Sequence, residues 1–338
     1  MVNIFKKKPI YLDYAALTPI DLEVLLLVQK LYDRSYANPN SLHKAGVAAD
    51  AILKQAKKDV AYCIGAHPDE IYFTSSATEA NRIALSVGKA LISPIEHSSV
   101  MESAIDPKFL KINKDGVVDI DIIKDEIKIV SVQWVNNEIG TIQPVYEIAK
   151  KVKEAGKLFH VDASQAPITQ EIDLKKVKAD LLVLDGNKIY GPRGVGILFV
   201  RRGTDIKIPR SATPNIPAIG GFALALNKIN KNREKNVTHF EKLNKLFDFE
   251  HINGSLRSPH IINISFPGKD AEFLLFQLDA AGISVSTKSS CMRDEDESYV
   301  LKAIGADSKS SLRFSFGTMT TEGEVKKVVE VLHKFVDR

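Results

Sequence analysis

The sequence predicts an α/β protein built around a largely parallel β-sheet. From about residue 50 onward, segments with helical spacing of apolar residues alternate with short, continuous apolar runs. Such runs are typical of strands that are buried on both faces, and their alternation with helices is the pattern of βα units. The 338 residues exceed the usual size of one domain, so we expect a large domain followed by a smaller one.

The individual elements follow in chain order. Helical spacing is expected over 51–64, 78–87 and 145–155, and apolar runs that predict strands lie at 71–73, 129–135, 158–161, 181–184 and 195–200. Three prolines between residues 208 and 217 then predict an irregular connection. After it we expect a long helix near 218–247, a strand at 261–266, a helix at 271–281, a strand at 312–316 and a closing helix over about 325–335.

Composition and charge exclude several classes of protein. The 46 basic and 42 acidic residues are too balanced for a nucleic-acid-binding protein, which usually has a concentrated basic face. No stretch approaches the ~20 apolar residues that cross a bilayer, and the start lacks the apolar core of a secretory signal. Two cysteines, Cys63 and Cys291, do not make a disulfide framework and fit a reducing compartment. We therefore expect a cytoplasmic protein with no nucleic-acid or membrane partner.

A lysine and a carboxylate follow two of the predicted strands. Lys188 lies just past the run 181–184, before a glycine-rich turn, and Asp162 ends the run that precedes it, with Gln165 three residues beyond. Ligands bind at strand ends in α/β sheets. Alone, Lys188 could be a solvated loop charge and Asp162 a helix N-cap. Together they suit a pyridoxal ring, because a carboxylate beside the ring nitrogen strengthens it as an electron sink.

A third strand end carries small hydroxyl residues. Tyr72-Phe-Thr-Ser-Ser-Ala-Thr-Glu-Ala-Asn runs from a strand into a helix. The free N–H groups and the dipole of a helix start can hold a phosphate, although Ser or Thr with Glu79 nearby also resembles an ordinary capping box. The ordered set of three such strand ends favours a cofactor that has both a ring and a phosphate.

Four further segments match one family in order: Tyr11-Leu-Asp-Tyr-Ala-Ala-Leu-Thr-Pro, Asn38-Pro-Asn-Ser-Leu-His, Val135-Asn-Asn-Glu-Ile-Gly and Ser310-Ser-Leu-Arg-Phe-Ser-Phe-Gly. With them the chain resembles the cysteine desulfurases of the class V aminotransferase group over nearly its whole length. The resemblance implies the type I fold of pyridoxal-phosphate enzymes, with a mostly parallel sheet of the seven-stranded type covered by helices and a smaller α+β C-terminal domain. It divides the chain into an N-terminal segment at 1–20, associated with the small domain, a large cofactor-binding domain at 21–215, and the connection and small domain at 216–338.

The resemblance assigns cofactor roles residue by residue. Lys188 would bind the aldehyde of pyridoxal 5'-phosphate covalently, and Asp162 would meet the pyridine nitrogen. The other cofactor-binding positions are Gln165 and Asn137 near the ring oxygen, Ala77 and Thr78 at the phosphate, and Thr213, in a reduced form of the motif that reaches the partner subunit's phosphate. His97 would stack on the ring and assist proton transfer, although a histidine on its own is more often structural. A homodimer and the absence of a metal site are implied as well.

The substrate and sulfur roles complete this assignment. Arg313 would grip the carboxylate of L-cysteine with its planar guanidinium fork, and Asn38 would be a second contact. Cys291 would receive the sulfur as a persulfide, because it lies in a polar, loop-like segment where a thiolate can be exposed. Cys63 lies in an apolar helical pattern and is expected to serve packing. Alanine would be released, and the sulfur would go to an acceptor or an iron–sulfur scaffold protein, or to tRNA thiolation.

Three positions depart from the family pattern. Asp185 stands where a small residue near the phosphate is usual, and a carboxylate ~4 Å from a phosphate costs about 1 to 4 kcal/mol, depending on hydration. We expect it to weaken cofactor binding unless it turns away, for example toward Arg193. Asn187 replaces a histidine and still donates a hydrogen bond. A glycine-rich loop is missing at 203–210, and Lys288-Ser-Ser-Cys replaces a form richer in small residues.

Two alternatives remain open on the sequence. Another class V lyase or aminotransferase would keep the cofactor and lack the desulfurase step. A degenerate, non-catalytic subunit for sulfur transfer would explain Asp185 and the shortened loop without turnover. A dinucleotide enzyme is disfavoured, because no Gly-x-Gly-x-x-Gly follows an early strand.

Overall fold

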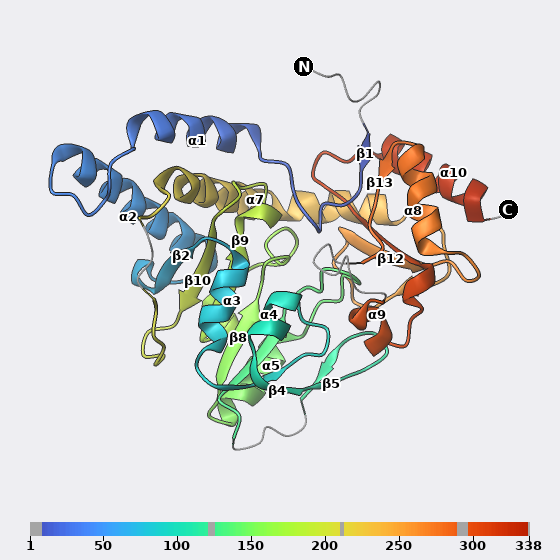
Figure 1. Cartoon of the computed structure of the whole chain (residues 1–338), viewed down its shortest axis with the longest axis horizontal. Helices are drawn as coiled ribbons and strands as arrows, with labels where there is room; N and C mark the ends of the chain where they lie inside the picture. Colours follow the sequence, from blue (N-terminus) through green and yellow to red (C-terminus); the bar gives the residue numbers. More distant parts are fainter. Residues whose placement is uncertain (1–8, 121–125, 210–212, 289–296, 337–338) are drawn as a thin grey trace.

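The computed structural model describes residues 9–120, 126–209, 213–288 and 297–336, and a seven-stranded sheet forms its centre (Figure 1). One strand, β10, runs antiparallel to both of its neighbours, and the other pairs are parallel. The predicted mostly parallel sheet is therefore confirmed. In spatial order the strands are β2 (Ile71–Thr74), β10 (Gly196–Val200), β9 (Leu181–Asp185), β8 (Leu158–Asp162), β7 (Ile129–Gln133), β3 (Lys89–Ile92) and β4 (Ile105–Phe109).

Helices cover this sheet on both faces. Every residue of β7, β9 and β10 is buried, which requires cover on each side of the sheet. In α5 the buried residues Val145, Ile148, Ala149 and Val152 form one apolar stripe, the pattern that places a helix against a core. The helices of this part are α2 (Lys44–Ile64), α3 (Ala77–Leu85), α4 (Ser98–Ser103), α5 (Val145–Glu154) and α6 (Leu174–Val177), with short 3₁₀ turns η1 (Pro68–Glu70) and η2 (Gly186–Lys188).

A long helix, α7 (Ile216–Asn244), links the central sheet to the C-terminal part (Figure 1). It packs against α1 (Leu22–Arg34) and α2, and also contacts α10 (Glu322–Val336). The helix begins where the sequence places its irregular connection: Asn215 accepts the N–H of Ala218 as N-cap, and Pro217 fits the first turn. In the described parts of the chain, no helix is both long and apolar enough to span a membrane.

The C-terminal part has a sheet of its own. Strands β11 (Ile252–Asn253), β12 (Ile261–Ser265) and β14 (Ser311–Ser315) are antiparallel, and β12 and β14 confirm the predicted strands at 261–266 and 312–316. Helices α8 (Ala271–Ala280), α9 (Tyr299–Ala303) and α10 (Glu322–Val336) accompany it, with a 3₁₀ turn, η4 (Ser308–Ser310). A small hairpin pairs β5 (Lys111–Ile112) with β6 (Val118–Asp119). The predicted helices at 271–281 and 325–335 are thus present.

The N-terminal segment contacts both the C-terminal part of the chain and the central sheet. Strand β1 (Ile10–Tyr11) pairs in parallel with β13 (Ile283–Ser284), and Asp13 bridges to Ser315 in β14. The segment continues toward the central sheet, where Thr18 donates a hydrogen bond from its hydroxyl to the carbonyl of Asn187 at 2.8 Å. The division into parts at 1–20, 21–215 and 216–338 stays a prediction.

Several elements of this fold were not predicted from the sequence, among them two strands of the central sheet and one long helix. Strands β3 and β4 are four and five residues long, and β4 is largely exposed. Helix α1 was also missed. Its N-cap, Asp21, accepts the N–H groups of Glu23 and Val24, but apolar Leu22 and Leu26 face solvent, which blurs the amphipathic pattern.

A buried histidine gives the fold a pH-dependent contribution to its stability. His260 is fully buried, where Nδ1 lies 2.8 Å from Ser258 Oγ, and burial lowers its pKa from 6.5 to about 3. The unfolded chain therefore binds more protons than the folded chain at mildly acid pH. His260 thus contributes a stability that is lost as the pH falls below about 6.5.

We expect the substitution His260→Phe to remove this dependence. Between pH 7.5 and pH 5 the unfolding free energy of the wild type should fall by about 2 kcal/mol relative to the variant, at about 1.36 kcal/mol per pKa unit. Ser258 keeps its bond to Thr169 at 2.5 Å in the variant. Urea unfolding of both proteins at several pH values measures this difference. A gap between the two proteins that does not change with pH would contradict the assignment.

Candidate active site

The carboxyl ends of the central strands meet at one edge of the sheet. In the parallel register Gln133 of β7 faces Asp162 of β8, and Asp185 is the last residue of β9. Beside them lies a cavity of ≈ 220 Å³. Most of the predicted site residues line it: Ala77, Thr78, His97, Asn137, Asp162, Gln165, Asp185, Asn187, Lys188 and Arg313. The structure thus gathers residues that are up to 236 positions apart, counted from Ala77 to Arg313.

Lys188 reaches this cavity from the turn η2 that follows β9. The turn is tight: a Cβ on Gly186 would lie 2.7 Å from the carbonyl oxygen of Pro192, so a glycine is required there. The Nζ of Lys188 donates to the carbonyl oxygens of Ala15 at 3.0 Å and Ala16 at 2.5 Å. The N-terminal segment therefore helps to aim the amine.

Asp162 is an acceptor that lines the same cavity. Its Oδ1 accepts from the N–H of Ser164 at 3.0 Å and from its Oγ at 2.6 Å, and its Oδ2 accepts from Asn81 Nδ2 at 3.0 Å. These donors are all neutral. The nearby carboxyl of Glu96 is fully buried, and burial raises its pKa well above the ordinary value. Asp162 is thus suited to pair with a cation in the cavity, such as a protonated ring nitrogen.

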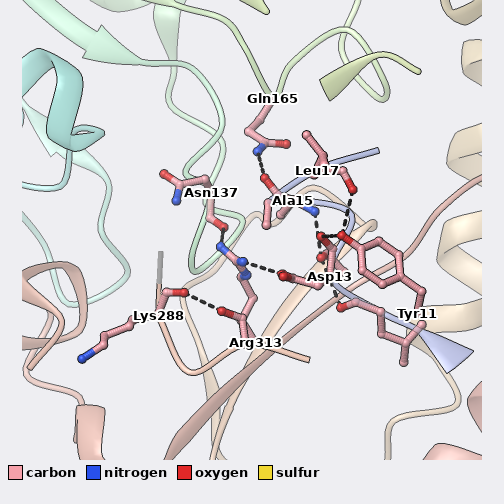
Figure 2. A network of polar contacts seen from close by, with 12 residues as sticks. Tyr11, Asp13, Ala15, Leu17, Asn137, Gln165, Lys288 and Arg313 are labelled. Carbon is pink, nitrogen blue, oxygen red and sulfur yellow. Dashed lines mark hydrogen bonds and ion pairs between the residues drawn. The ribbon is translucent and has the colours of Figure 1, made fainter. Parts of the chain in front are cut away.

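Gln165 and Asn137 line the cavity, as predicted, but their amides already make contacts. Gln165 Nε2 donates to the carbonyl of Ala15 at 2.8 Å, and Asn137 Oδ1 accepts from Gln133 Nε2 at 3.2 Å. Figure 2 shows Gln165 and Asn137 around the N-terminal segment and Arg313. Their predicted approach to a ring oxygen stays a prediction.

The start of helix α3 also lines the cavity. Ser76 is its N-cap and accepts the N–H of Glu79 at 3.2 Å. Ala77 and Thr78 occupy the first turn, where backbone N–H groups lack partners within a helix. A Cβ on Gly196 would lie 2.8 Å from the backbone of Ser76, so this glycine lets β10 approach the turn closely. The turn is fit to hold a phosphate.

Asp185 lies in the same cavity and does not turn away toward Arg193. Its Oδ1 accepts the N–H of Asn187 at 2.8 Å, which makes it the cap of η2. The side chain of Arg193 is exposed, and among the described residues no ion pair joins the two. Burial raises the pKa of Asp185. Because this capping bond is made with a residue only two positions along the chain, it keeps the carboxylate at the cavity.

His97 lines the cavity as the N-cap of α4. Its Nδ1 accepts the N–H of Ser99 at 3.2 Å and lies 2.9 Å from Ser99 Oγ. The residue before it, Glu96, accepts the N–H of Gln133 at 2.6 Å, and its carbonyl accepts a bond from the Tyr299 hydroxyl. Ser99 therefore holds Nδ1 of the imidazole, and the bonds of Glu96 fix the residue before it.

Arg313, at the centre of β14, is 1% exposed. Its Nη2 pairs with Asp13 Oδ1 at 2.6 Å, and its Nη1 donates to the carbonyl of Asn137 at 2.9 Å (Figure 2). Its Nε is buried and has no hydrogen-bond partner among the described atoms. A planar fork that is fixed on one side and has a donor left over can bind a carboxylate.

Asn38 and Thr213 are not brought into this cavity. Both lie apart from it and close to one another, with Asn38 Nδ2 at 3.5 Å from Thr213 Oγ1. Thr213 lines a second cavity, of ≈ 630 Å³. Their roles at a substrate or a partner subunit's phosphate stay predictions. Cys291 lies outside the described residues.

Sequence reasoning missed several polar residues of the site. Asn81 and Ser99 are buried and connect Asp162 with His97, Gln133 lines the cavity, and Asp13 holds Arg313. Asn81 carried one available signal, because it falls one helical turn after Ala77 on a helix whose start was already assigned to phosphate.

Comparisons with known proteins agree with this geometry. A family model for class-V aminotransferases matches residues 10–211 and 205–328. A relative named mitosomal cysteine desulfurase, from Trachipleistophora hominis, is 36% identical and covers 95% of this chain and 84% of its own length. A solved structure titled NifS-like protein has a TM-score of 0.90 at 30% identity, covering 97% of this chain and 99% of its own. Another, titled SspA in complex with cysteine, has a TM-score of 0.79 at 28% identity, covering 90% and 98%.

The chain belongs to the class V aminotransferase family, within its cysteine desulfurase branch. It is therefore an enzyme that depends on pyridoxal 5'-phosphate, and the predicted type I fold is confirmed. The residues present fit this cofactor, with Asp162 for the ring nitrogen, Lys188 for the aldehyde and the start of α3 for the phosphate. When bound, the cofactor draws electrons away from the Cα of an amino acid. The alternative of a non-catalytic subunit is not retained.

Proposed function

We propose that this enzyme removes sulfur from L-cysteine, releases L-alanine and transfers the sulfur to Cys291 as a persulfide. The cavity supports this proposal because it combines a lysine amine, a carboxylate for the cofactor ring and an arginine fork. The relatives named cysteine desulfurases and the SspA structure titled as a complex with cysteine support the choice of substrate.

Arg313 would orient the substrate. Asp13 and the carbonyl of Asn137 fix two of its nitrogens, so the guanidinium cannot rotate. A substrate carboxylate would satisfy the buried Nε, which otherwise lacks an acceptor. This contact would hold the Cα of cysteine near Lys188, whose amine would remove the α-proton.

The sulfur transfer from cysteine to Cys291 needs no additional oxidant or reductant. The thiolate of Cys291 attacks the sulfur of cysteine, the Cβ–S bond of the substrate breaks, and an S–S bond forms on the enzyme. The electron pair of the broken bond stays with the carbon side. Its Cα regains the proton that Lys188 removed, its Cβ takes up a further proton, and the product leaves as alanine. His97, held at the cavity by Ser99, is placed to move that proton.

The choice of Cys291 is supported by the contacts of the described residues that flank positions 289–296. Before residues 289–296, Ser286 exchanges backbone bonds with Arg313, at 2.6 and 3.2 Å. After them, Ser298 Oγ donates to Glu138 Oε2 at 2.6 Å, and Tyr299 bonds to the carbonyl of Glu96. Each of these contacts involves a residue in the cavity or next to one. The described residues on either side of positions 289–296 therefore lie beside the site.

Cys63 is a poor alternative as the sulfur acceptor. It is buried in α2, with Asn227 Nδ2 at 3.9 Å from its sulfur, and burial raises the pKa of its thiol. The thiolate is the nucleophilic form, so a raised pKa and burial both work against attack. The packing role predicted for Cys63 is consistent with this environment.

We expect Cys291→Ser to abolish release of alanine and sulfide from cysteine, and Cys63→Ala to leave it at the wild-type level. Incubation with ³⁵S-cysteine, followed by non-reducing electrophoresis with and without dithiothreitol, would show the protein-bound sulfur. Wild type and Cys63→Ala should carry label that dithiothreitol removes. Unchanged turnover in Cys291→Ser would overturn the proposal in favour of another class V lyase or aminotransferase.

We further propose a homodimer that delivers sulfur to an acceptor such as an iron–sulfur scaffold protein or to tRNA thiolation. Large apolar side chains exposed on α1 and α2, among them Leu22, Leu26 and Tyr62, support an interface there. The balanced charge and the two cysteines support a cytoplasmic location. The mitosomal name of the Trachipleistophora hominis relative makes an organelle the alternative.

A further inference from the structure

A chain of hydrogen bonds runs from Asp162 to His97 through two residues that the proposed chemistry does not use. Asn81 Nδ2 lies 3.0 Å from Asp162 Oδ2 and 2.9 Å from Ser99 Oγ. Ser99 Oγ lies 2.9 Å from His97 Nδ1. Asn81 and Ser99 are 0% and 4% exposed, so water does not compete for these bonds.

The direction of every bond in this chain follows from its two ends. An ionised carboxylate only accepts, so Asn81 must turn its NH₂ group toward Asp162. The second hydrogen of that NH₂ then goes to Ser99 Oγ, which must accept it. The single hydrogen of the Ser99 hydroxyl is left to point at His97 Nδ1.

The backbone gives independent support for this direction. The N–H of Ser99 donates to the same His97 Nδ1 at 3.2 Å. A backbone N–H can only donate, so Nδ1 must present a lone pair. A neutral imidazole carries one proton, which therefore lies on Nε2.

We propose that Asn81 and Ser99 are positioning residues that hold neutral His97 in its Nε2–H tautomer and make it a hydrogen-bond donor toward the cavity. The tautomer of a histidine is set by the bond that its other nitrogen makes. The same chain ties this choice to Asp162, the carboxylate that we assign to the cofactor ring. A change that turned Asn81 around would disturb both groups at once. The use of this donor in catalysis rests on the proposed desulfurase function, whereas the tautomer does not.

The experiment is ¹⁵N nuclear magnetic resonance of the histidine rings, on the cofactor-loaded protein and on the apoprotein, at a pH where the imidazole is neutral. Long-range ¹H–¹⁵N correlations distinguish a protonated nitrogen from one with a lone pair, and a His97→Gln variant identifies the signals of His97. We expect Nε2–H in the wild type. A wild-type spectrum with the proton on Nδ1 would overturn the proposal without any variant.

Two substitutions at Ser99 and one beside it test the side chains. Ser99→Ala removes one donor to Nδ1, and the ratio of the tautomers should move toward Nδ1–H by about fivefold, as expected for one hydrogen bond. Ser99→Thr should restore the wild-type ratio, and Ser98→Ala should not change it. An unchanged ratio in Ser99→Ala would rule out Ser99 as a positioning residue.

Measurements of kcat and KM distinguish a failure of the tautomer proposal from a failure of the proposed desulfurase function. If Nε2–H acts in the reaction, Ser99→Ala should lower kcat for cysteine with little change in KM, and Ser99→Thr should recover it. An enzyme that shows the expected tautomers but does not release alanine from cysteine would contradict the desulfurase proposal and leave the tautomer assignment standing.

Discussion

Replacing Asp185 with serine should tighten the binding of pyridoxal phosphate by about fivefold to several-hundredfold. The carboxylate lines the same cavity as Ala77 and Thr78, at the start of α3. Repulsion between a carboxylate and a phosphate ~4 Å apart amounts to about 1 kcal/mol in water and about 4 at an intermediate dielectric. At 1.4 kcal/mol per factor of ten, this range gives the expected gain in affinity. Serine can still accept the N–H of Asn187, so the cap of η2 is kept.

The gain in cofactor affinity from Asp185→Ser should increase as the pH rises. Burial raises the pKa of Asp185, and a bound phosphate dianion would raise it further. At low pH the neutral acid can donate to a phosphate oxygen, whereas at high pH the anion repels it. The advantage of Asp185→Ser should therefore be larger at pH 8 than at pH 5.5.

Titration of the apoprotein with pyridoxal phosphate, followed by absorbance, measures this effect. Asp185→Asn removes the charge with little change in shape and should behave like the serine variant. Asp279→Ser changes an exposed carboxylate on α8 and should leave the affinity unchanged. If neither variant of Asp185 binds the cofactor more tightly than the wild type, Asp185 does not face the phosphate.

Lys188→Ala should eliminate both the visible absorption of the covalently bound cofactor and measurable turnover. The lysine supplies the amine for the covalent bond and, in our proposal, the base for the α-proton. Loss of a general base alone typically slows a reaction by about 10²- to 10⁴-fold. The carbonyls of Ala15 and Ala16, which hold Nζ, remain in the variant, so the shape of the site is kept.

Small amines provide a sharper form of this experiment. Methylamine can enter the space left by the Lys188 side chain and act as a base, so it should restore part of the turnover in Lys188→Ala. Lys175→Ala, at an exposed position in α6, should retain full colour and activity. A coloured, active Lys188→Ala protein would show that another residue binds the cofactor.

The parts of the molecule that sequence reasoning found share a physical cause. Strands β7, β8 and β9 are continuous apolar runs because helices cover both of their faces, and their last residues mark the site because ligands bind at strand ends. Asp162 and Lys188 could therefore be placed before the structure was known. Motif resemblance added the more distant residues His97, Asn137 and Arg313.

The parts of the molecule that sequence reasoning missed depend on contacts between distant segments. Asn81 and Ser99 lie on separate helices, and a buried polar residue on a helix does not differ in the sequence from an exposed one. The sequence left open whether Asp185 turns toward Arg193, and a local cap with Asn187 holds it in place. Strand β3 is only four residues long, and its place between β4 and β7 follows from pairing alone. In each case a contact with a partner determines where the residue or strand lies, and the surrounding sequence does not identify that partner.

The threading of the N-terminal segment between the two sheets has a consequence for biosynthesis. Asp13 pairs with Arg313 and the N–H of Ala15 donates to Ser315, across 300 positions, while Ala15 and Ala16 hold the lysine that binds the cofactor. The N-terminal segment, which is synthesised first, can therefore make these contacts only after nearly the last strand has been synthesised. Such long-range pairing forms slowly. A nascent chain should acquire its cofactor only after strand β14 has left the ribosome, so a chain truncated before residue 311 would be synthesised, and even partly folded, without becoming an enzyme.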